Sequence, residues 1–308
     1  MIETEKKVIY KAFGFSLESE IALPELPPVT GNVESIDIEI VIDDLSKLWL
    51  ELSDKENAFV IKGNFVMFQV PNIATFSIQE GKKISVSPIK EDDEDVIRLY
   101  ILGTCMGAIL MQRRILPLHG SAVVINGKAY GFMGNSGAGK STTASAFLNH
   151  GHKLLSDDVI AVSLSHEGDI PYVTPSYPQQ KLWQDSITKL GMENKYRPIY
   201  GREDKYCIPV ALNYLNDPIP LAGVFEIVKT EEEQIGIRKI DNLERFYTLY
   251  YNTYQNCFIQ NLGLMDWHFN TTAKIVDKID IYQIHRPVSG TSSAQIVSQI
   301  LKTISKGE

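Results

Sequence analysis

A glycine-rich octapeptide in the middle of the chain, Gly134-Asn135-Ser136-Gly137-Ala138-Gly139-Lys140-Ser141, matches the pattern G-x-x-x-x-G-K-[ST] at every position. An apolar run at residues 129–133 precedes it, and a run with helical spacing follows at residues 142–150. A strand, a phosphate-binding loop and a helix in this order are the setting that the pattern requires. We therefore expect an α/β domain built around this loop.

The residue types of the octapeptide suit a nucleoside triphosphate. Glycines let the backbone curl until several N–H groups face one phosphate chain, and the start of the next helix adds partial positive charge. We expect residues 134–139 and Thr142 to contact the phosphates, and Lys140 to reach the terminal ones. The hydroxyl of Ser141 is the expected Mg²⁺ ligand.

Two strand-like runs, residues 118–125 and 128–133, flank the pair Asn126-Gly127. This pair favours the tight turn of a β-hairpin. The phosphate loop would then follow the second arm of an antiparallel hairpin, whereas an ordinary doubly wound domain has a parallel strand there.

Three further polar residues are candidates for chemistry. Asp157 and Asp158 follow a short apolar run, where one carboxylate could order Mg²⁺ and the other could accept a proton from an attacking hydroxyl. His119, at the start of the hairpin, could bind phosphate oxygens or orient an aspartate. A solvated turn pair and a packed structural histidine are the alternatives for these positions.

The rest of the chain predicts two domains. Residues 1–91 have short alternating runs typical of strands, and we interpret them as a smaller β-rich accessory domain. Residues 92–308 form the expected catalytic domain, beginning with a helix over residues 93–114. Strands are expected at 36–42, 58–62, 64–70, 74–79, 83–88, 159–164, 221–228 and 280–285, and helices at 181–190, within 243–261 and at 292–304.

Composition excludes several classes. A net charge of −8 argues against a general nucleic-acid binder. The three cysteines are widely spaced, so they suggest neither a disulfide framework nor a zinc site. The charged N-terminus lacks the apolar core of a signal peptide, and no apolar stretch has the length of a membrane span, so we expect a cytoplasmic protein.

Three motifs in this order resemble the HPr kinase/phosphorylase family, and the similarity is dense over residues 117–164. They are His119-Gly120, the loop at 134–141 and the segment Gly151-His152-Lys153-Leu154-Leu155-Ser156-Asp157-Asp158. The resemblance implies the family's α/β fold, an HPr kinase C-terminal-like P-loop domain related to phosphoenolpyruvate carboxykinase. It implies an ATP- and Mg²⁺-dependent kinase in which Asp158 accepts the proton of a substrate serine. His119 and Lys140 match further active-site positions, Ser141 matches a Mg²⁺ ligand, and Asp157 would support the metal or its waters.

Two departures from the regulatory members of that family are present. Residues 178–183 lack the glutamate of the family's E-x-R-G-like segment, which disfavours the reverse phosphorylase reaction. Residues 12–26 are similar to stand-alone HPr kinase-like proteins of peptide natural-product pathways. In lasso-peptide clusters such proteins phosphorylate a serine of the precursor peptide. The resemblance thus implies a precursor peptide or small protein as partner, and it is compatible with a homo-oligomer.

Other functions remain open at the level of sequence. The alternatives are a regulatory kinase of a carrier-protein serine, a small-molecule kinase and a nucleotide-gated binding module. In the small-molecule kinase, Tyr177, Trp183 and the aromatic run 246–254 could line a pocket, although core packing also explains these aromatic residues. We interpret residues 197–206 either as a mobile loop over the site or as a solvated loop. The basic residues that could close on the triphosphate are Arg197, Arg202, Lys205 and Arg286.

Overall fold

The computed structural model describes residues 7–54, 57–90, 94–193, 196, 198–199, 202–288 and 293–307. The protein is a mixed α/β structure with sheets of seven, eight and three strands. The chain divides into two compact units, one made of Met1–Pro117 with Gln255–His268, the other of Leu118–Tyr254 with Phe269–Glu308.

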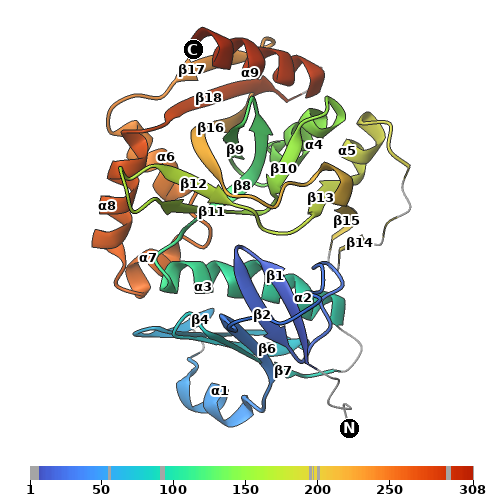
Figure 1. Cartoon of the computed structure of the whole chain (residues 1–308), viewed down its shortest axis with the longest axis vertical. Coiled ribbons are helices and arrows are strands. Elements are labelled where there is room, and N and C mark those ends of the chain that lie inside the picture. Colours follow the sequence, from blue (N-terminus) through green and yellow to red (C-terminus); the bar gives the residue numbers. More distant parts are fainter. Residues whose placement is uncertain are drawn as a thin grey trace. The chain divides into compact units, whose positions relative to one another are not determined.

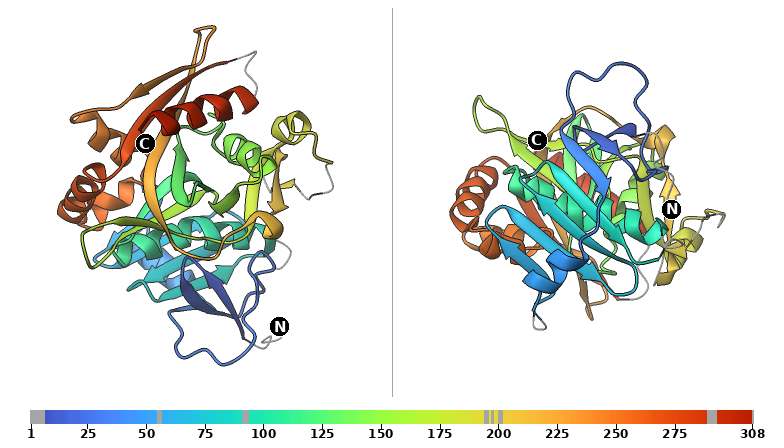
Figure 2. Two further views of the ribbon diagram at one scale, coloured as in Figure 1. Left: turned by 45° about the horizontal axis from the view of Figure 1, so that its top comes forward. Right: turned by 90° about the horizontal axis from the view of Figure 1, so that it is seen from below.

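The first unit is built on the seven-stranded sheet, in the order β1-β2-β3-β7-β6-β5-β4 (Figure 2, right). The third strand runs parallel to both of its neighbours, and the other pairs are antiparallel. Its strands are β1 (Val8–Ala12), β2 (Phe15–Ser19), β3 (Ile38–Ile42), β4 (Phe59–Lys62), β5 (Phe65–Val70), β6 (Ala74–Gln79) and β7 (Lys83–Pro88). The last five confirm the predicted strands.

Two elements of this unit were not predicted. The hairpin β1–β2 turns at Phe13 and Gly14, whose φ angles of 53° and 78° are those of a type I′ turn, but a phenylalanine there gives no turn signal. Helix α1 (Ser46–Leu52) packs Leu48, Trp49 and Leu52 against Met67 of β5. Because the helix depends on this tertiary contact, the local sequence does not predict it.

The opposite face of the sheet holds a helical run made of α2 (Glu94–Tyr100), a π-helical turn η1 (Ile101–Cys105) and α3 (Met106–Gln112). It confirms the helix predicted over 93–114, apart from residue 93, which lies outside the described residues. The Tyr100 ring lies 5.8 Å from that of Phe76. The side-chain amide of Gln112 donates to the carbonyl of Asn64 at 3.0 Å and accepts from the amide of Gly81 at 2.7 Å.

These contacts move the predicted domain boundary. The helical run buries its apolar side on the first sheet, so the first unit extends to Pro117 rather than ending at residue 91. It also includes helix α7 (Cys257–Asn261), whose Phe258 ring lies edge-on to Phe59 at 4.9 Å. A sequence boundary placed at the acidic run 91–95 could not reveal a segment that returns from much later in the chain.

The second unit contains the eight-stranded sheet, in the order β10-β8-β11-β12-β16-β18-β17, with β9 paired to both β8 and β16 (Figure 1). The hairpin β8–β9 is antiparallel, whereas β16 runs parallel to both β9 and β18. Its strands are β8 (Leu116–Ile125), β9 (Lys128–Met133), β10 (Lys153–Ser156), β11 (Val159–Leu164), β12 (Pro171–Thr174), β16 (Ile219–Thr230), β17 (Gly236–Lys239) and β18 (Asp280–Pro287).

The hairpin turn confirms the sequence prediction. Asn126 and Gly127 have φ angles of 50° and 75°, and the turn pairs Ile125 with Lys128. Both central residues are therefore left-handed, as a type I′ turn requires, and asparagine and glycine are the residues that adopt this conformation at least cost. The strand predictions at 159–164, 221–228 and 280–285 are also confirmed, with β16 and β18 somewhat longer than predicted.

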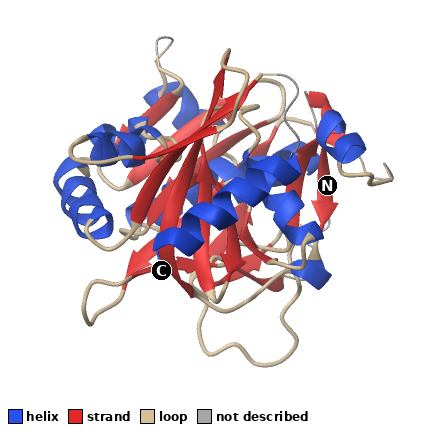
Figure 3. Ribbon diagram, turned by 90° about the horizontal axis from the view of Figure 1, so that it is seen from above, coloured by secondary structure: helices blue, strands red, loops and turns tan. Residues whose placement is uncertain are grey.

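Helices α4 (Lys140–Asn149) and α9 (Ser293–Gly307) pack together on one face of this sheet (Figure 3). Phe147 of α4 stacks on Phe132 of β9 with ring centroids 5.4 Å apart, and Ile296 and Ile300 of α9 join the same buried cluster. Phenylalanine rings buried at this depth contribute about 2 to 3 kcal/mol each. This core fixes the helix that follows the phosphate loop.

A small sheet in the order β13-β15-β14 completes the second unit, with strands β13 (Gln179–Trp183), β14 (Pro198–Ile199) and β15 (Arg202–Pro209). The helix predicted over 181–190 is wrong in its first part, because residues 181–183 pair with β15 and only α5 (Gln184–Lys189) is helical. Residues 202–206 form a strand, not a loop. Arg197 and the side chain of Arg202 lie outside the described residues.

The remaining helices are α6 (Glu244–Tyr251), α8 (Met265–Val276) and a 3₁₀ turn η2 (Ala211–Asn213). The aromatic-rich helical region predicted within 243–261 is therefore two helices, α6 and α7, with a bridge at Thr253 between them. Among the described residues, no helix combines the length and the apolar character needed to cross a bilayer.

Candidate functional site

The phosphate-loop motif lies where the sequence placed it, between the end of β9 at Met133 and the start of α4 at Lys140. Gly134 has a φ of 129°, and a Cβ there would lie 2.4 Å from the carbonyl oxygen of Ile227, so only glycine fits. Gly137 and Gly139 also have positive φ. Residues 135–137 form an exposed loop tip, at the N-terminal end of α4 where the helix dipole favours an anion.

Lys140 curls back over this loop. Its ammonium lies 2.7 Å from the carbonyl oxygen of Gly134 and 3.2 Å from that of Asn135, and the residue is 9% exposed. Burial lowers the pKa of Lys140, and the nearby carboxylates of Asp158 and Asp157 only partly oppose this effect. A buried ammonium held by neutral carbonyls is a group that an incoming anion would stabilise.

The next two residues of α4 turn their hydroxyls to different surroundings. Ser141 is half-buried in the first helical turn, next to the loop. Thr142 places its hydroxyl 2.7 Å from that of Ser186 in α5. The predicted phosphate contact of Thr142 would therefore rest on its backbone N–H, since its side chain already has a partner.

Arg286 of β18 holds the outer side of the loop. Its Nε donates to the carbonyl of Ala138 at 2.6 Å, and its Nη2 lies 3.4 Å from the carbonyl of Gly137. Two loop carbonyls thus accept hydrogen bonds from one guanidinium. The structure therefore places the Arg286 side chain against the loop, and its closing on a triphosphate stays a prediction.

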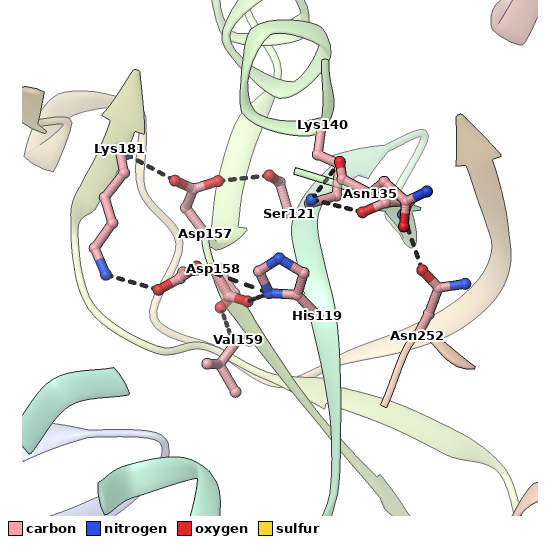
Figure 4. A network of polar contacts seen from close by, with 11 residues as sticks. His119, Ser121, Asn135, Lys140, Asp157, Asp158, Val159, Lys181 and Asn252 are labelled. Carbon is pink, nitrogen blue, oxygen red and sulfur yellow. Dashed lines mark hydrogen bonds and ion pairs between the residues drawn. The ribbon is translucent and has the colours of Figure 1, made fainter. Parts of the chain in front are cut away.

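Asp157 is buried and its carboxylate has a protein partner at each oxygen. The hydroxyl of Ser121 donates to Oδ1 at 2.5 Å, and the backbone N–H of Lys181 donates to Oδ2 at 2.7 Å (Figure 4). A metal bound at Asp157 would have to share these oxygens. Within the described parts of the chain, no cluster of three or more His, Cys, Asp or Glu side chains could hold a metal ion.

Asp158 is the neighbouring carboxylate and faces a different set of groups. Its φ of 75° is left-handed, and its Oδ2 lies 2.7 Å from the ammonium of Lys181. Its Oδ1 lies 3.8 Å from Nδ1 of His119 (Figure 4). Burial alone would raise the pKa of Asp158, but the charge of Lys181, then that of His119, outweighs burial and lowers the pKa. Asp158 is therefore ionised at neutral pH.

His119 lies where β8 meets the aspartates. Its Nδ1 is 3.1 Å from the carbonyl oxygen of Asp158, and its ring lies 5.5 Å from that of Tyr254. Burial lowers the pKa of His119, although Asp158 opposes the shift. The following Gly120 permits the close pairing of β8 with β9 at this point, because a Cβ at residue 120 would lie 2.3 Å from the carbonyl oxygen of Phe132.

Lys181 is the first of three residues of this site that the sequence did not predict. It is 6% exposed, it binds Asp157 through its backbone and Asp158 through its side chain, and the field of Asp158 raises its pKa well above the usual range despite burial. No motif marks a lysine on a distant strand. Two residues further along β13, Trp183 pairs with Lys205 of β15, whose ammonium lies 5.6 Å from the centre of the indole ring.

Two further residues were also missed. Ser121 lies two positions after His119 on the same strand, so strand alternation could have placed both side chains on one face. Asn252, after helix α6, accepts the Gly134 N–H through Oδ1 at 3.0 Å (Figure 4), and nothing local in the sequence connects these residues. The structure thus brings together the loop, Lys140, Asp157, Asp158 and His119, and adds Ser121, Lys181 and Asn252.

Comparison with known proteins finds distant likenesses among solved structures alone. No protein-family model matches the chain, and no curated protein matches it. One of these solved structures is the Hpr(Ser) kinase/phosphatase from Coxiella burnetii. The match covers 62% of this chain and 95% of that chain, with 16% sequence identity and a TM-score of 0.33. A likeness this weak leaves the assignment of function to the chemistry of the site.

Proposed function

We propose that this protein is a kinase that transfers the γ-phosphate of ATP to a serine hydroxyl of a peptide. One observation carries the proposal: an ionised carboxylate, Asp158, shares a cluster with the ammonium of Lys140 at the head of the phosphate loop. A nucleotide-binding module needs the loop alone. A phosphoryl transfer to a hydroxyl also needs a proton acceptor beside it.

Binding of the triphosphate would use the loop and its lysine. The N–H groups of residues 134–142 and the dipole of α4 would hold the phosphates, and Lys140 would exchange its carbonyl partners for phosphate oxygens. We propose that the hydroxyl of Ser141, half-buried in the first turn of α4, would hold Mg²⁺, which would neutralise charge on the phosphates when bound. We propose that Asp157 supports the metal or its waters without binding the metal directly, because both of its carboxylate oxygens already have protein partners.

In the transfer step the serine oxygen forms a bond to the γ-phosphorus while the bond from phosphorus to the β-phosphate oxygen breaks. The serine proton passes to the carboxylate of Asp158, and ADP leaves with the electron pair of the broken bond. Lys181 holds Asp158 in place by the 2.7 Å ion pair. Because this chemistry depends chiefly on positioning and electrostatics, a weakly basic carboxylate in the right place is sufficient.

We propose a precursor peptide, such as that of a lasso peptide, as the acceptor. The support is the sequence resemblance of residues 12–26 to stand-alone HPr kinase-like proteins, together with the absence of an acidic residue at 178–183, where Lys181 is found instead. A lysine bound to Asp158 offers no ligand for a second metal. The forward kinase reaction is accordingly proposed without the reverse phosphorylase reaction.

The test is to incubate the purified protein with Mg-ATP and serine-bearing peptides, including precursor peptides from neighbouring genes, and to analyse them by mass spectrometry. The proposal predicts one added phosphate on a serine, with an equal amount of ADP formed. ATP binding without phosphate transfer to any peptide, carrier protein, sugar or nucleoside would instead favour a nucleotide-gated binding module.

A further inference from the structure

We propose that Asn252 is a positioning residue that holds the first amide of the phosphate loop and the backbone of His119 in one fixed arrangement. The inference rests on the proposed function for its catalytic meaning, but its structural content is independent of any activity. Asn252 lies just after helix α6, more than a hundred residues along the chain from either partner. It touches no reacting atom, so its effect would act through the loop and His119.

The first contact is with the loop. The Gly134 N–H donates to Oδ1 of Asn252 at 3.0 Å, and this hydrogen bond is buried. Gly134 is the residue at which β9 ends and the chain turns into the loop, with a φ of 129°. A side-chain acceptor at this amide therefore fixes the direction in which the loop leaves the sheet.

The second contact is with the strand of His119. The His119 N–H donates to the carbonyl of Asn252 at 2.6 Å, and Leu118 pairs with Thr253 in an isolated antiparallel bridge. The ring of Tyr254 then lies beside the imidazole of His119. One short segment, residues 252–254, thus holds β8 through its backbone and the loop through a side chain.

The orientation of the Asn252 amide is set by its other partners. Its Nδ2 donates to Oε1 of Glu226 at 3.1 Å and to the carbonyl of Thr248 at 2.9 Å. The other oxygen of Glu226 accepts from Nε2 of Gln283 at 2.7 Å. Because both neighbours of Nδ2 are acceptors, the amide cannot flip, and its oxygen must face Gly134.

Strand register explains why Glu226 is available. In β16 it lies opposite Met133 of β9, the residue before the loop, and opposite Gln283 of β18. Asn252 is 7% exposed, so removal of its side chain would leave the Gly134 N–H without a partner in a buried place. We expect this to loosen the loop and to weaken nucleotide binding without unfolding the chain.

Two readouts separate the inference from the proposed function. Labelling methionine with ¹³C at the carbonyl and glycine with ¹⁵N selects, by NMR, only glycine amides that follow a methionine. These are Gly134 after Met133 and Gly107 after Met106. Gly107 in α3 serves as the internal reference. Hydrogen exchange of Gly134 relative to Gly107 measures the loop contact in the protein without nucleotide. Titration with Mg-ATP measures its consequence.

Five proteins suffice: wild type, Asn252→Ala, Asn252→Asp, the double variant Asn252→Asp/Glu226→Gln, and a control. Asn252→Ala should speed Gly134 exchange and weaken Mg-ATP binding, each at least about tenfold. Asn252→Asp keeps the acceptor but sets two carboxylates together. Glu226→Gln in the same chain supplies a donor, so the double variant should bind Mg-ATP at least about threefold more tightly than Asn252→Asp alone. Asn149→Ala, at the exposed end of α4, is the control.

The outcomes are distinct. If Asn252→Ala leaves Gly134 exchange as slow as in the wild type, the inference is overturned. Faster exchange with an unchanged Mg-ATP dissociation constant would also overturn it, because the loop would then not depend on Asn252 for function. Failure of the wild type to bind Mg-ATP would overturn the proposed function, and the exchange ratio would still decide whether Asn252 fixes the loop.

Discussion

The ammonium of Lys181 lies 2.7 Å from the carboxylate of Asp158, and the same residue donates its backbone N–H to Asp157 at 2.7 Å. One residue of β13 thereby fixes both aspartates that follow β10. Its charge also keeps the pKa of Asp158 below the ordinary value despite burial. The ion pair therefore links the stability of this part of the fold to the ionisation of the proposed proton acceptor.

Replacing Lys181 by methionine should destabilise the protein, because the buried carboxylate of Asp158 would lose its ammonium. We expect a loss of about 3 kcal/mol in the free energy of unfolding, the lower end for a broken buried pair, since 20% of the Asp158 side chain is exposed. Urea unfolding at pH 7 measures the loss. Lys189→Met, on the exposed side of α5, should change stability by less than about 0.5 kcal/mol.

The same pair predicts a pH dependence. Asp158 has a lowered pKa in the folded state. Its contribution to the free energy of unfolding is therefore present above about pH 4 and is lost as the pH falls through the folded-state pKa. Lys181 has a raised pKa, so its contribution is present below about pH 10 and is lost as the pH rises through its folded-state pKa. The difference in free energy of unfolding between the wild type and Lys181→Met should thus shrink at both low and high pH. A difference that stayed constant from pH 3 to pH 7 would contradict this.

Lys140→Met should separate function from stability. Burial lowers the pKa of Lys140, so its charge is unfavourable in the protein without nucleotide, and the variant should have an equal or higher melting temperature. Affinity for Mg-ATP should fall about 10- to 100-fold, the value of a charge-assisted hydrogen bond to phosphate. Calorimetric titration and thermal unfolding give both numbers, with Lys302→Met on α9 as the control. Unchanged affinity would remove the loop from the proposed site.

Gly120→Ala should be strongly destabilising for a steric reason alone. The new Cβ would lie 2.3 Å from the carbonyl oxygen of Phe132, within the β8–β9 hairpin, although the backbone angle at residue 120 is ordinary. Gly236 is a matched strand glycine whose nearest neighbour to a new Cβ is 3.8 Å away, so Gly236→Ala should be nearly neutral. A chemical denaturation series should show a difference of at least about 2 kcal/mol between the two variants.

Local features of the site could be predicted from the sequence. The G-x-x-x-x-G-K-[ST] pattern, the Asn126-Gly127 turn and the position of Asp157-Asp158 each reflect chemistry within a few neighbouring residues. The structure places them as predicted, at the end of β9, between β8 and β9, and between β10 and β11. Five strands of the first unit were also predictable, because alternation of apolar residues is a local signal.

Long-range contacts could not be predicted. Lys181 was assigned to a helix because residues 181–190 have helical spacing, yet pairing of Lys181 with Cys207 of β15 makes it a strand residue. Asn252 meets Gly134 across 118 positions of the chain, a distance over which no local pattern acts. The domain boundary was misplaced for the same reason, since the helical run 94–112 owes its place to contacts with Asn64, Phe76 and Gly81.

The most direct test of the central claim compares wild type with Asp158→Asn in two measurements, the dissociation constant of Mg-ATP and the rate of phosphopeptide formation. We expect the variant still to bind Mg-ATP within a few-fold of the wild type. Its transfer rate should fall by at least about 100-fold, because asparagine cannot accept the serine proton. A variant that binds Mg-ATP and phosphorylates peptide at the wild-type rate would contradict the assignment of Asp158 and the mechanism built on it.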